Sequence, residues 1–286
     1  MSLPPVTVSA PGSPGAFTDP ELFFKCQKPE IKNLLNSPEI LKCDAVAEIV
    51  ASYVTGSEDP FGAAEWMKYW AIDVGQEPAL PKEFGAFWFS PDPIDPTKKV
   101  KVCETHLPPI FRPQRIRHIR INSEVAYSFN VLGLLVQNSK EGPSPKFLAE
   151  AEAMAFSQYG QTEAGPGCWL VMRRGGLAGN FSYPEQIQFI RNLNARTQAQ
   201  YEETTSAIDL ATIVFSRYVA TRERHLGDSQ GMEGQWTFAR CREVVTSNGG
   251  DHLQVALGGF TPGGGLDVQY SSFSSRHYIV VALRKF

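Results

Sequence analysis

Residues 208–227, IDLATIVFSRYVATRERHLG, constrain the fold more than any other part of the sequence. Their apolar side chains recur at helical spacing, and one stripe consists of Ile208, Ala211, Phe215 and Val219. A second set widens this stripe and consists of Leu210, Ile213, Val214 and Tyr218. A helix that is apolar around most of its circumference belongs in a protein interior. We therefore predict that this segment is the central helix of the domain.

Four short segments follow this helix, and glycine-rich or serine-rich turns separate them. They read WTFARCREVV, HLQVALGGF, GLDVQYSSF and RHYIVVALRKF. Short segments joined by such turns are typical of an antiparallel meander. Because strands and helices are segregated along the chain, the sequence predicts an α+β fold. The predicted sheet is mostly antiparallel, and its C-terminal meander packs on the buried central helix.

The remaining segments predict further helices and strands. Helical patterns lie in 36–56, 59–73, 144–160 and the region after residue 182. Strand patterns lie in 168–174 and in 115–139, where we expect two strands and where VLGLLVQ has the pattern of a buried strand. Prolines exclude a long regular element from 75–99, which predicts an ordered loop or linker whose aromatic residues pack onto the body.

The N-terminal segment has a different composition from the rest. Residues 1–20 are rich in Pro, Ser, Gly and Thr and contain few large apolar groups. Such a composition cannot compensate the entropy of ordering by burial. We therefore predict a disordered tail over 1–20 and a single α+β domain over 21–286.

Charge and hydropathy limit the partners. The net charge is -3 with a pI near 6.0, which disfavours a nucleic-acid partner because gripping phosphates needs a basic excess. No run approaches the ~20 apolar residues of a membrane span, so we predict no membrane insertion. Another protein is the partner class left open, and the oligomeric state is not determined.

Cysteine usage bears on the compartment. The five cysteines have no CxxC spacing, and their number is odd for a disulfide framework. Together with the lack of an ordinary signal peptide, this predicts a cytoplasmic protein. Delivery into a host cell by a non-classical secretion signal is the alternative.

The glycines of GGFTPGGG, residues 258–265, raise the question of a phosphate loop. Such a loop needs its glycines between a strand and a helix, whose free N–H groups hold the anion. A strand pattern follows here instead, and the Lys-Ser/Thr ending of a P-loop is missing. We therefore predict a structural hairpin and no bound cofactor.

Catalytic and metal-binding motifs are weak. The five histidines contain no HExxH motif, so the sequence predicts no metal site. Cys103 and His106, in CETH, could bring a thiol next to an imidazole, but we prefer a chance spacing as the explanation.

One candidate ligand site rests on charged residues near the central helix and the first meander strand. Arg240 and Arg242 alternate with Cys241, so in a strand their side chains lie on the same face. Two arginines on one face can bind an anionic group together through paired hydrogen bonds. The full candidate set is Arg240, Arg242, Glu243, Arg222 and His225. The set requires the end of the central helix to lie beside this strand. An exposed charged face is the alternative interpretation.

Several sequence blocks carry a resemblance to a known family. They include AEWMKYWAIDVGQEPALP, KKVKVCETH and WLVMRR. Further matching positions lie near the C-terminus: Thr237, Arg240, Cys241, Glu243, Gly258, Gly259, Phe260, Gly265, Leu266 and 282–286. With gaps from about residue 61 to the end, the chain resembles uncharacterised proteins from chlamydia-like bacteria that live in amoebae.

The resemblance implies a bacterial protein and no particular activity. It departs from the family at LPPIFRPQRIRHIR, where relatives continue as a smooth apolar strand, and in 142–165, which has no match. Because some relatives carry this region beside interaction modules, the first hypothesis is a protein-interaction module, with a host-directed effector as one form of it. The alternatives are an enzyme or small-molecule binder that holds an anion on Arg240 and Arg242, and a structural subunit of an assembly.

Overall fold

The computed structural model describes residues 60–118, 123–141, 144–147, 157–177, 181–226, 237–261, 265–271 and 278–286. The chain divides into two units, 1–47 and 48–286, and all described residues belong to the second. The predicted tail, the helix predicted in 36–56 and most of the helix predicted in 144–160 lie outside the described residues.

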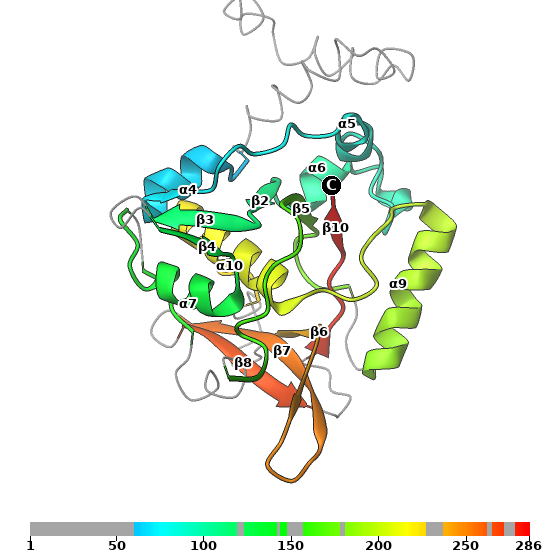
Figure 1. Cartoon of the computed structure of the whole chain (residues 1–286). Helices are drawn as coiled ribbons and strands as arrows, with labels where there is room; N and C mark the ends of the chain where they lie inside the picture. The colour runs from blue at the N-terminus through cyan, green and yellow to red at the C-terminus, as the bar shows by residue number, and fades with distance from the viewer. Residues whose placement is uncertain are drawn as a thin grey trace, which may run out of the picture. The chain divides into compact units, whose positions relative to one another are not determined.

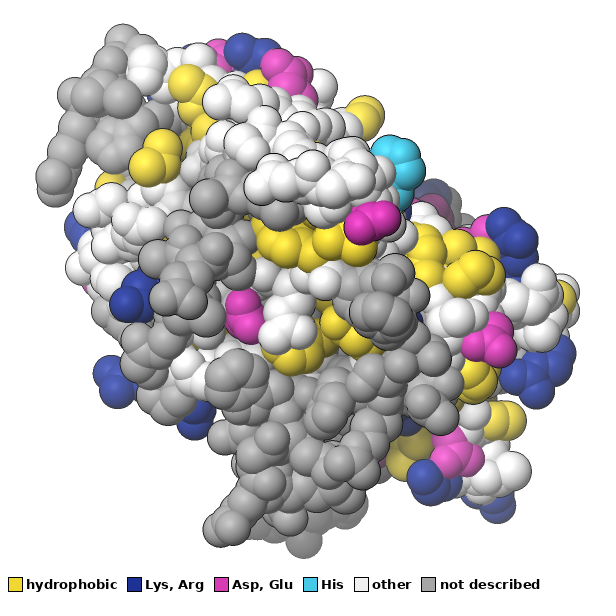
Figure 2. Space-filling view, turned by 90° about the horizontal axis from the view of Figure 1, so that it is seen from below, with side chains coloured by type: hydrophobic (Ala, Val, Ile, Leu, Met, Phe, Trp, Pro, Cys, Tyr) yellow, Lys and Arg dark blue, Asp and Glu magenta, His cyan; other side chains and the backbone are white. Residues whose placement is uncertain are grey.

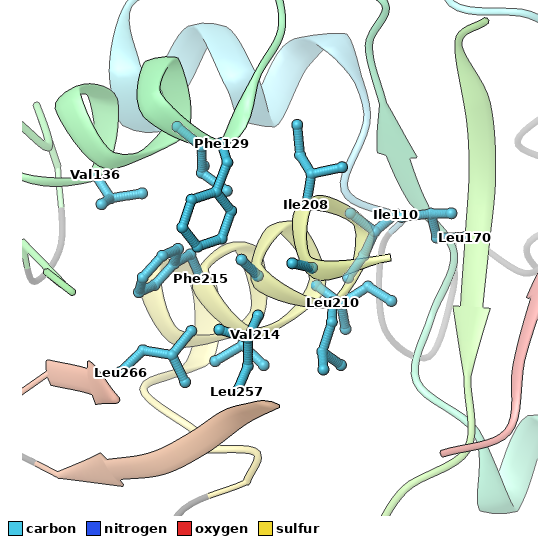
Figure 3. Packing of buried hydrophobic residues seen from close by; sticks show 14 of the residues in the cluster. Ile110, Phe129, Val136, Leu170, Ile208, Leu210, Val214, Phe215, Leu257 and Leu266 are labelled. Carbon is cyan, nitrogen blue, oxygen red and sulfur yellow. The ribbon is translucent and has the colours of Figure 1, made fainter. Parts of the chain in front are cut away.

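The central helix is α10, Ala207–Thr221, and the prediction of its burial is confirmed. It begins at Ser206, whose Oγ accepts the backbone N–H of Asp209, and it ends at Arg222, which adopts a left-handed conformation. Side chains from strands on both sides and from another helix surround it (Figure 3). Since its apolar residues cover nearly the whole circumference, α10 forms the core against several layers at once.

The meander lies below α10 in Figure 1 and confirms the predicted fold class. It comprises β6, Phe238–Thr246, β7, His252–Thr261, and β8, Gly265–Ser271, which pair in antiparallel order. β7 and β8 form the predicted hairpin, since they pair in antiparallel order up to Thr261 and Gly265. A Cβ atom on Gly265, which has φ +98°, would lie 2.2 Å from the carbonyl oxygen of Lys146, so only glycine fits there.

The last segment of the chain adds the predicted fourth strand to this sheet, but that strand is short and parallel, and the chain then leaves the sheet. Its first part, β9, Tyr278–Ile279, pairs with β6 in parallel. Its second part, β10, Leu283–Lys285, joins a separate sheet of order β10-β5-β2. The partners in that sheet are β5, Cys168–Met172, and β2, Ile110–Arg112. A short apolar strand fits either sheet, so its pattern could not decide between them.

A third sheet has the order β1-β3-β4, and two of its strands lie in 115–139, where two strands were predicted. Its strands are β1, Ile72–Asp73, β3, Arg115–His118, and β4, Ser123–Ala126. The VLGLLVQ segment, however, belongs to the helix α7, Phe129–Val136, which Ser128 caps by accepting the N–H of Val131. A short continuous apolar run does not distinguish a buried strand from a buried helix.

Other helices cover the outside of these sheets. They are α4, Ala63–Trp70, α5, Lys82–Trp88, α6, Val102–Thr105, α9, Tyr183–Thr197, and the 3-10 turn η2, Pro96–Lys98. The aromatic residues predicted to pack onto the body do so, because Phe84, Phe87 and Trp88 are buried. Within the described part of the chain, no helix combines the length and apolar character that crossing a bilayer requires.

Candidate functional site

Three neighbouring strands place polar side chains at one end of the sheet face that packs on α10. Arg112 of β2 is paired with Cys168 of β5, and Lys285 of β10 is paired with Leu170, two residues further along β5. Paired residues share a face, and so do residues two apart on a strand. The same face continues with Ile110 and Leu170 against α10 (Figure 3). The polar residues therefore meet the first turn of α10.

Asp209, in that first turn, is the centre of the cluster. Its Oδ1 lies 2.6 Å from Nε of Arg112, and the two side chains are only 2% and 4% exposed. The two atoms do not have the geometry of a hydrogen bond, so this contact is an ion pair. Its Oδ2 lies 2.8 Å from Nζ of Lys285 and also accepts the hydroxyl of Ser206. One carboxylate thus binds two cations and a hydroxyl.

The guanidinium of Arg112 is held from its other side by the loop that leads into β5. It donates to the carbonyl oxygens of Gly165, at 2.9 Å, and Pro166, at 2.7 Å. It also donates to Sγ of Cys168 at 3.2 Å. The arginine is therefore fixed in position, and it links β2, β5 and α10.

A pocket of about 260 Å³ opens over this cluster, and we call it the Asp209 pocket. Its titratable lining contains three basic and three acidic side chains as well as a thiol and a phenol. These residues are Arg112, Arg242, Lys285, Glu163, Asp209, Glu243, Cys168 and Tyr159. Charges of both signs therefore face the same space.

The protonation states of the lining follow from burial and from neighbours. Burial raises the pKa of the Cys168 thiol, and the nearby Arg112 only partly offsets this. Burial also raises the pKa of Glu243. For Lys285, burial lowers the pKa, but the Asp209 carboxylate more than offsets it, so the net direction is upward. At neutral pH the thiol is therefore protonated and Lys285 is charged.

Two of the five predicted ligand residues, Arg242 and Glu243, line this pocket. Glu243 accepts the N–H of Ala207, the first residue of α10, at 2.9 Å, so its carboxylate occupies the positive end of that helix. Arg242 is exposed, and its Nε lies 3.5 Å from Glu243.

Arg240 has a different environment from Arg242. Its guanidinium donates to the carbonyl of Phe181 at 2.7 Å and lies 4.1 Å from the ring centre of Tyr278. It is not among the residues that line the Asp209 pocket. The register of β6 against β7 shifts between Arg240 and Val244, and such a bulge breaks the simple alternation on which the predicted arginine fork depended.

Arg222 and His225 lie at the opposite end of α10, a helix of 15 residues. At 1.5 Å per residue, that helix separates its two ends by roughly 22 Å. Arg222 is the exposed C-terminal cap, and His225 lines a second pocket. The five predicted residues therefore do not form one site.

The ligand set predicted from the sequence did not include Arg112, Asp209 or Lys285. One signal was available, because Asp209 is an acidic residue within a helix that the sequence predicts to be buried. A buried carboxylate needs a cation or several hydrogen bonds. Nothing in the sequence, however, shows which of the many basic residues supplies the charge.

The structure also shows the surroundings of His106 and Cys103 in the CETH motif. His106 is fully buried, and its Nδ1 lies 3.2 Å from the carbonyl oxygen of Val102. Nδ1 also lies 2.9 Å from Oγ1 of Thr105, which can donate or accept, and Nε2 lies 2.9 Å from the Tyr201 hydroxyl. Both ring nitrogens thus have partners other than Cys103. Among the described residues, no group of three or more His, Cys, Asp and Glu side chains could hold a metal ion.

Comparisons with protein-family models, with curated proteins and with solved structures found no match for this chain. The resemblance to proteins of chlamydia-like bacteria therefore stays a prediction.

Proposed function

We propose that the protein binds a small zwitterionic molecule, of the size of an amino acid, in the Asp209 pocket. The observation that carries the proposal is the buried Arg112–Asp209–Lys285 cluster in the wall of an open pocket. Apolar residues stabilise a core at least as well as a buried ion pair does. The binding of a charged ligand would explain why Arg112, Asp209 and Lys285 lie in the wall of this pocket in place of apolar residues.

The composition of the lining supports a ligand that carries both charges. Lys285 and Arg242 are cations that suit a carboxylate, and Glu243 and Glu163 are acids that suit an ammonium group. The volume of about 260 Å³ lies below the range of ~300–1,000 Å³ that is usual for drug-sized ligands, so it favours a compact molecule.

The protonation states favour binding over catalysis. A nucleophilic cysteine needs a thiolate, but burial raises the pKa of Cys168. Among the possible general bases, Lys285 is kept protonated by the Asp209 carboxylate, and Glu243 already accepts the N–H of Ala207 at the start of α10. The described lining contains no histidine.

Thermal denaturation with each of the standard amino acids at millimolar concentration tests this proposal. We expect at least one of them to raise Tm, because a ligand that binds only the folded state stabilises it. We expect Arg242→Gln to weaken that shift and Arg191→Gln, the control, to preserve it. Arg191 is also an exposed arginine paired with a glutamate, Glu203, but it lies on α9. A flat Tm across the panel would refute the proposal.

A second candidate is the protein-interaction module predicted from the sequence. Figure 2 favours it, since hydrophobic side chains gather near the middle of the face seen there. Lys and Arg side chains are spread around the edge of that face instead. Light scattering over a concentration series tests whether the chain associates with itself. If the mass stays that of a monomer at every concentration, the chain does not associate with itself, and the partner must be a different protein.

A further inference from the structure

A second pocket, of about 210 Å³, lies at the C-terminal end of α10, and we call it the Arg224 pocket. It is lined by the end of β5, the turn at Gly175 and Gly176, residues 224–226, the start of β6 and the segment around β9. Among the described residues, its ionisable lining consists of Arg173, Arg224 and His225, without a carboxylate. The Asp209 pocket, in contrast, contains balanced charges.

The surroundings of this pocket add to its positive charge. Glu223 is a single carboxylate that faces Arg217 at 3.0 Å, His225 at 3.4 Å and Arg174 at 3.6 Å. Arg173 lies 3.4 Å from Asp92. In the described part of the chain, the five arginines 173, 174, 217, 222 and 224 therefore outnumber the two carboxylates, Asp92 and Glu223, around this end of α10.

Arg224 is the cation best placed to receive a ligand. It is exposed at the pocket, and in the described part of the chain it has no ion-pair partner. Burial lowers the pKa of His225, and Glu223 only partly offsets this, so the imidazole is neutral at pH 7. The arginines therefore provide the charge, and the imidazole provides a hydrogen-bonding group.

The remaining wall of the pocket is apolar and narrow. It contains Met172, Leu226, Ile279 and Val281. Gly176 keeps the backbone close to Ile279, because a Cβ atom at that position would lie 2.5 Å from the isoleucine side chain. A ligand with an anionic end and a small apolar body matches this arrangement.

We propose that the Arg224 pocket binds a small phosphomonoester, with the phosphate on Arg224, Arg173 and His225 and the carbon part against the apolar wall. Guanidinium groups match the geometry of phosphate oxygens and can donate two parallel hydrogen bonds to them. This site is separate from the Asp209 pocket, and it does not depend on the function proposed for that pocket.

Isothermal titration calorimetry of the full chain with phenyl phosphate tests the proposal. We expect phenyl phosphate to bind at least about tenfold more tightly than inorganic phosphate, because the ring reaches the apolar wall. We expect Arg224→Gln to weaken binding by about tenfold or more and Arg191→Gln to leave it unchanged. Arg224 is exposed, so its replacement does not endanger the fold.

Two results would overturn the proposal: no heat of binding with phenyl phosphate, or an equal Kd for wild type and Arg224→Gln. If inorganic phosphate binds as tightly as phenyl phosphate, the assignment of a phosphomonoester is wrong. Measuring amino-acid thermal shifts on Arg224→Gln separates the two sites, since a shift that persists there belongs to the Asp209 pocket.

Discussion

The burial of His106 leads to a prediction about acid stability. Its ring is 0% exposed, and this burial lowers its pKa from the ordinary 6.5 to about 4. The unfolded chain therefore binds a proton at this residue more readily than the folded chain does. The stability that the neutral ring contributes is complete above pH 6.5 and is lost as the pH falls towards 4.

The magnitude follows from these two pKa values. With 6.5 in the unfolded chain and about 4 in the folded protein, linkage predicts a loss of about 2 kcal/mol between pH 7 and pH 5. The loss reaches about 3 kcal/mol between pH 7 and pH 4. His106→Gln removes the titration and keeps a side chain that can hydrogen-bond to Tyr201.

Urea denaturation at a series of pH values measures this effect. The difference in unfolding free energy between wild type and His106→Gln cancels the contributions of other titrating groups. We expect this difference to shift against the wild type by about 2 kcal/mol from pH 7 to pH 5. His252→Gln, at an exposed histidine, controls for the loss of an imidazole. A difference that stays constant over this range would refute the reasoning.

Three further predictions concern the fold and the Asp209 cluster. In α7, Leu132 is buried and Leu134 is 67% exposed, so Leu132→Ala should cost about 2–5 kcal/mol and Leu134→Ala less than about 0.5 kcal/mol in urea denaturation. Similar losses of unfolding free energy for the two variants would indicate a strand in VLGLLVQ, because residues two apart share a strand face. A Cβ on Gly258 would lie 2.0 Å from the backbone oxygen of Thr237, so Gly258→Ala should lower the unfolding free energy by about 1–3 kcal/mol. Gly249→Ala, which meets nothing closer than 3.6 Å, is its control, and equal denaturation midpoints would contradict the close approach. Arg112→Met leaves Asp209 short of one cation and should destabilise the protein by about 3–5 kcal/mol, whereas the double variant Arg112→Met with Asp209→Leu should recover much of that loss. A double variant as unstable as the sum of its single variants would show that the two residues do not act as a pair.

Elements whose residue pattern allows only one environment could be predicted from the sequence. The helix at 207–221 is apolar on nearly every side, so it could only be central. The strands after it alternate and are joined by glycine turns, which implied a meander beside a buried helix. The positive φ of Gly265 is a local property of a tight turn, whereas its close approach to the backbone of Lys146 is a tertiary contact.

Which segments meet depends on tertiary packing. By its pattern VLGLLVQ could be helix or strand, and it forms the helix α7, which packs on α10. The final strand could belong to the meander by its pattern, and it pairs with β5 instead. The Asp209 cluster brings together residues of β2, β10 and α10, which are far apart in the chain. Local periodicity shows which face of a segment is buried. It carries no information about which distant side chain packs against that face, so the site could not be located from the sequence.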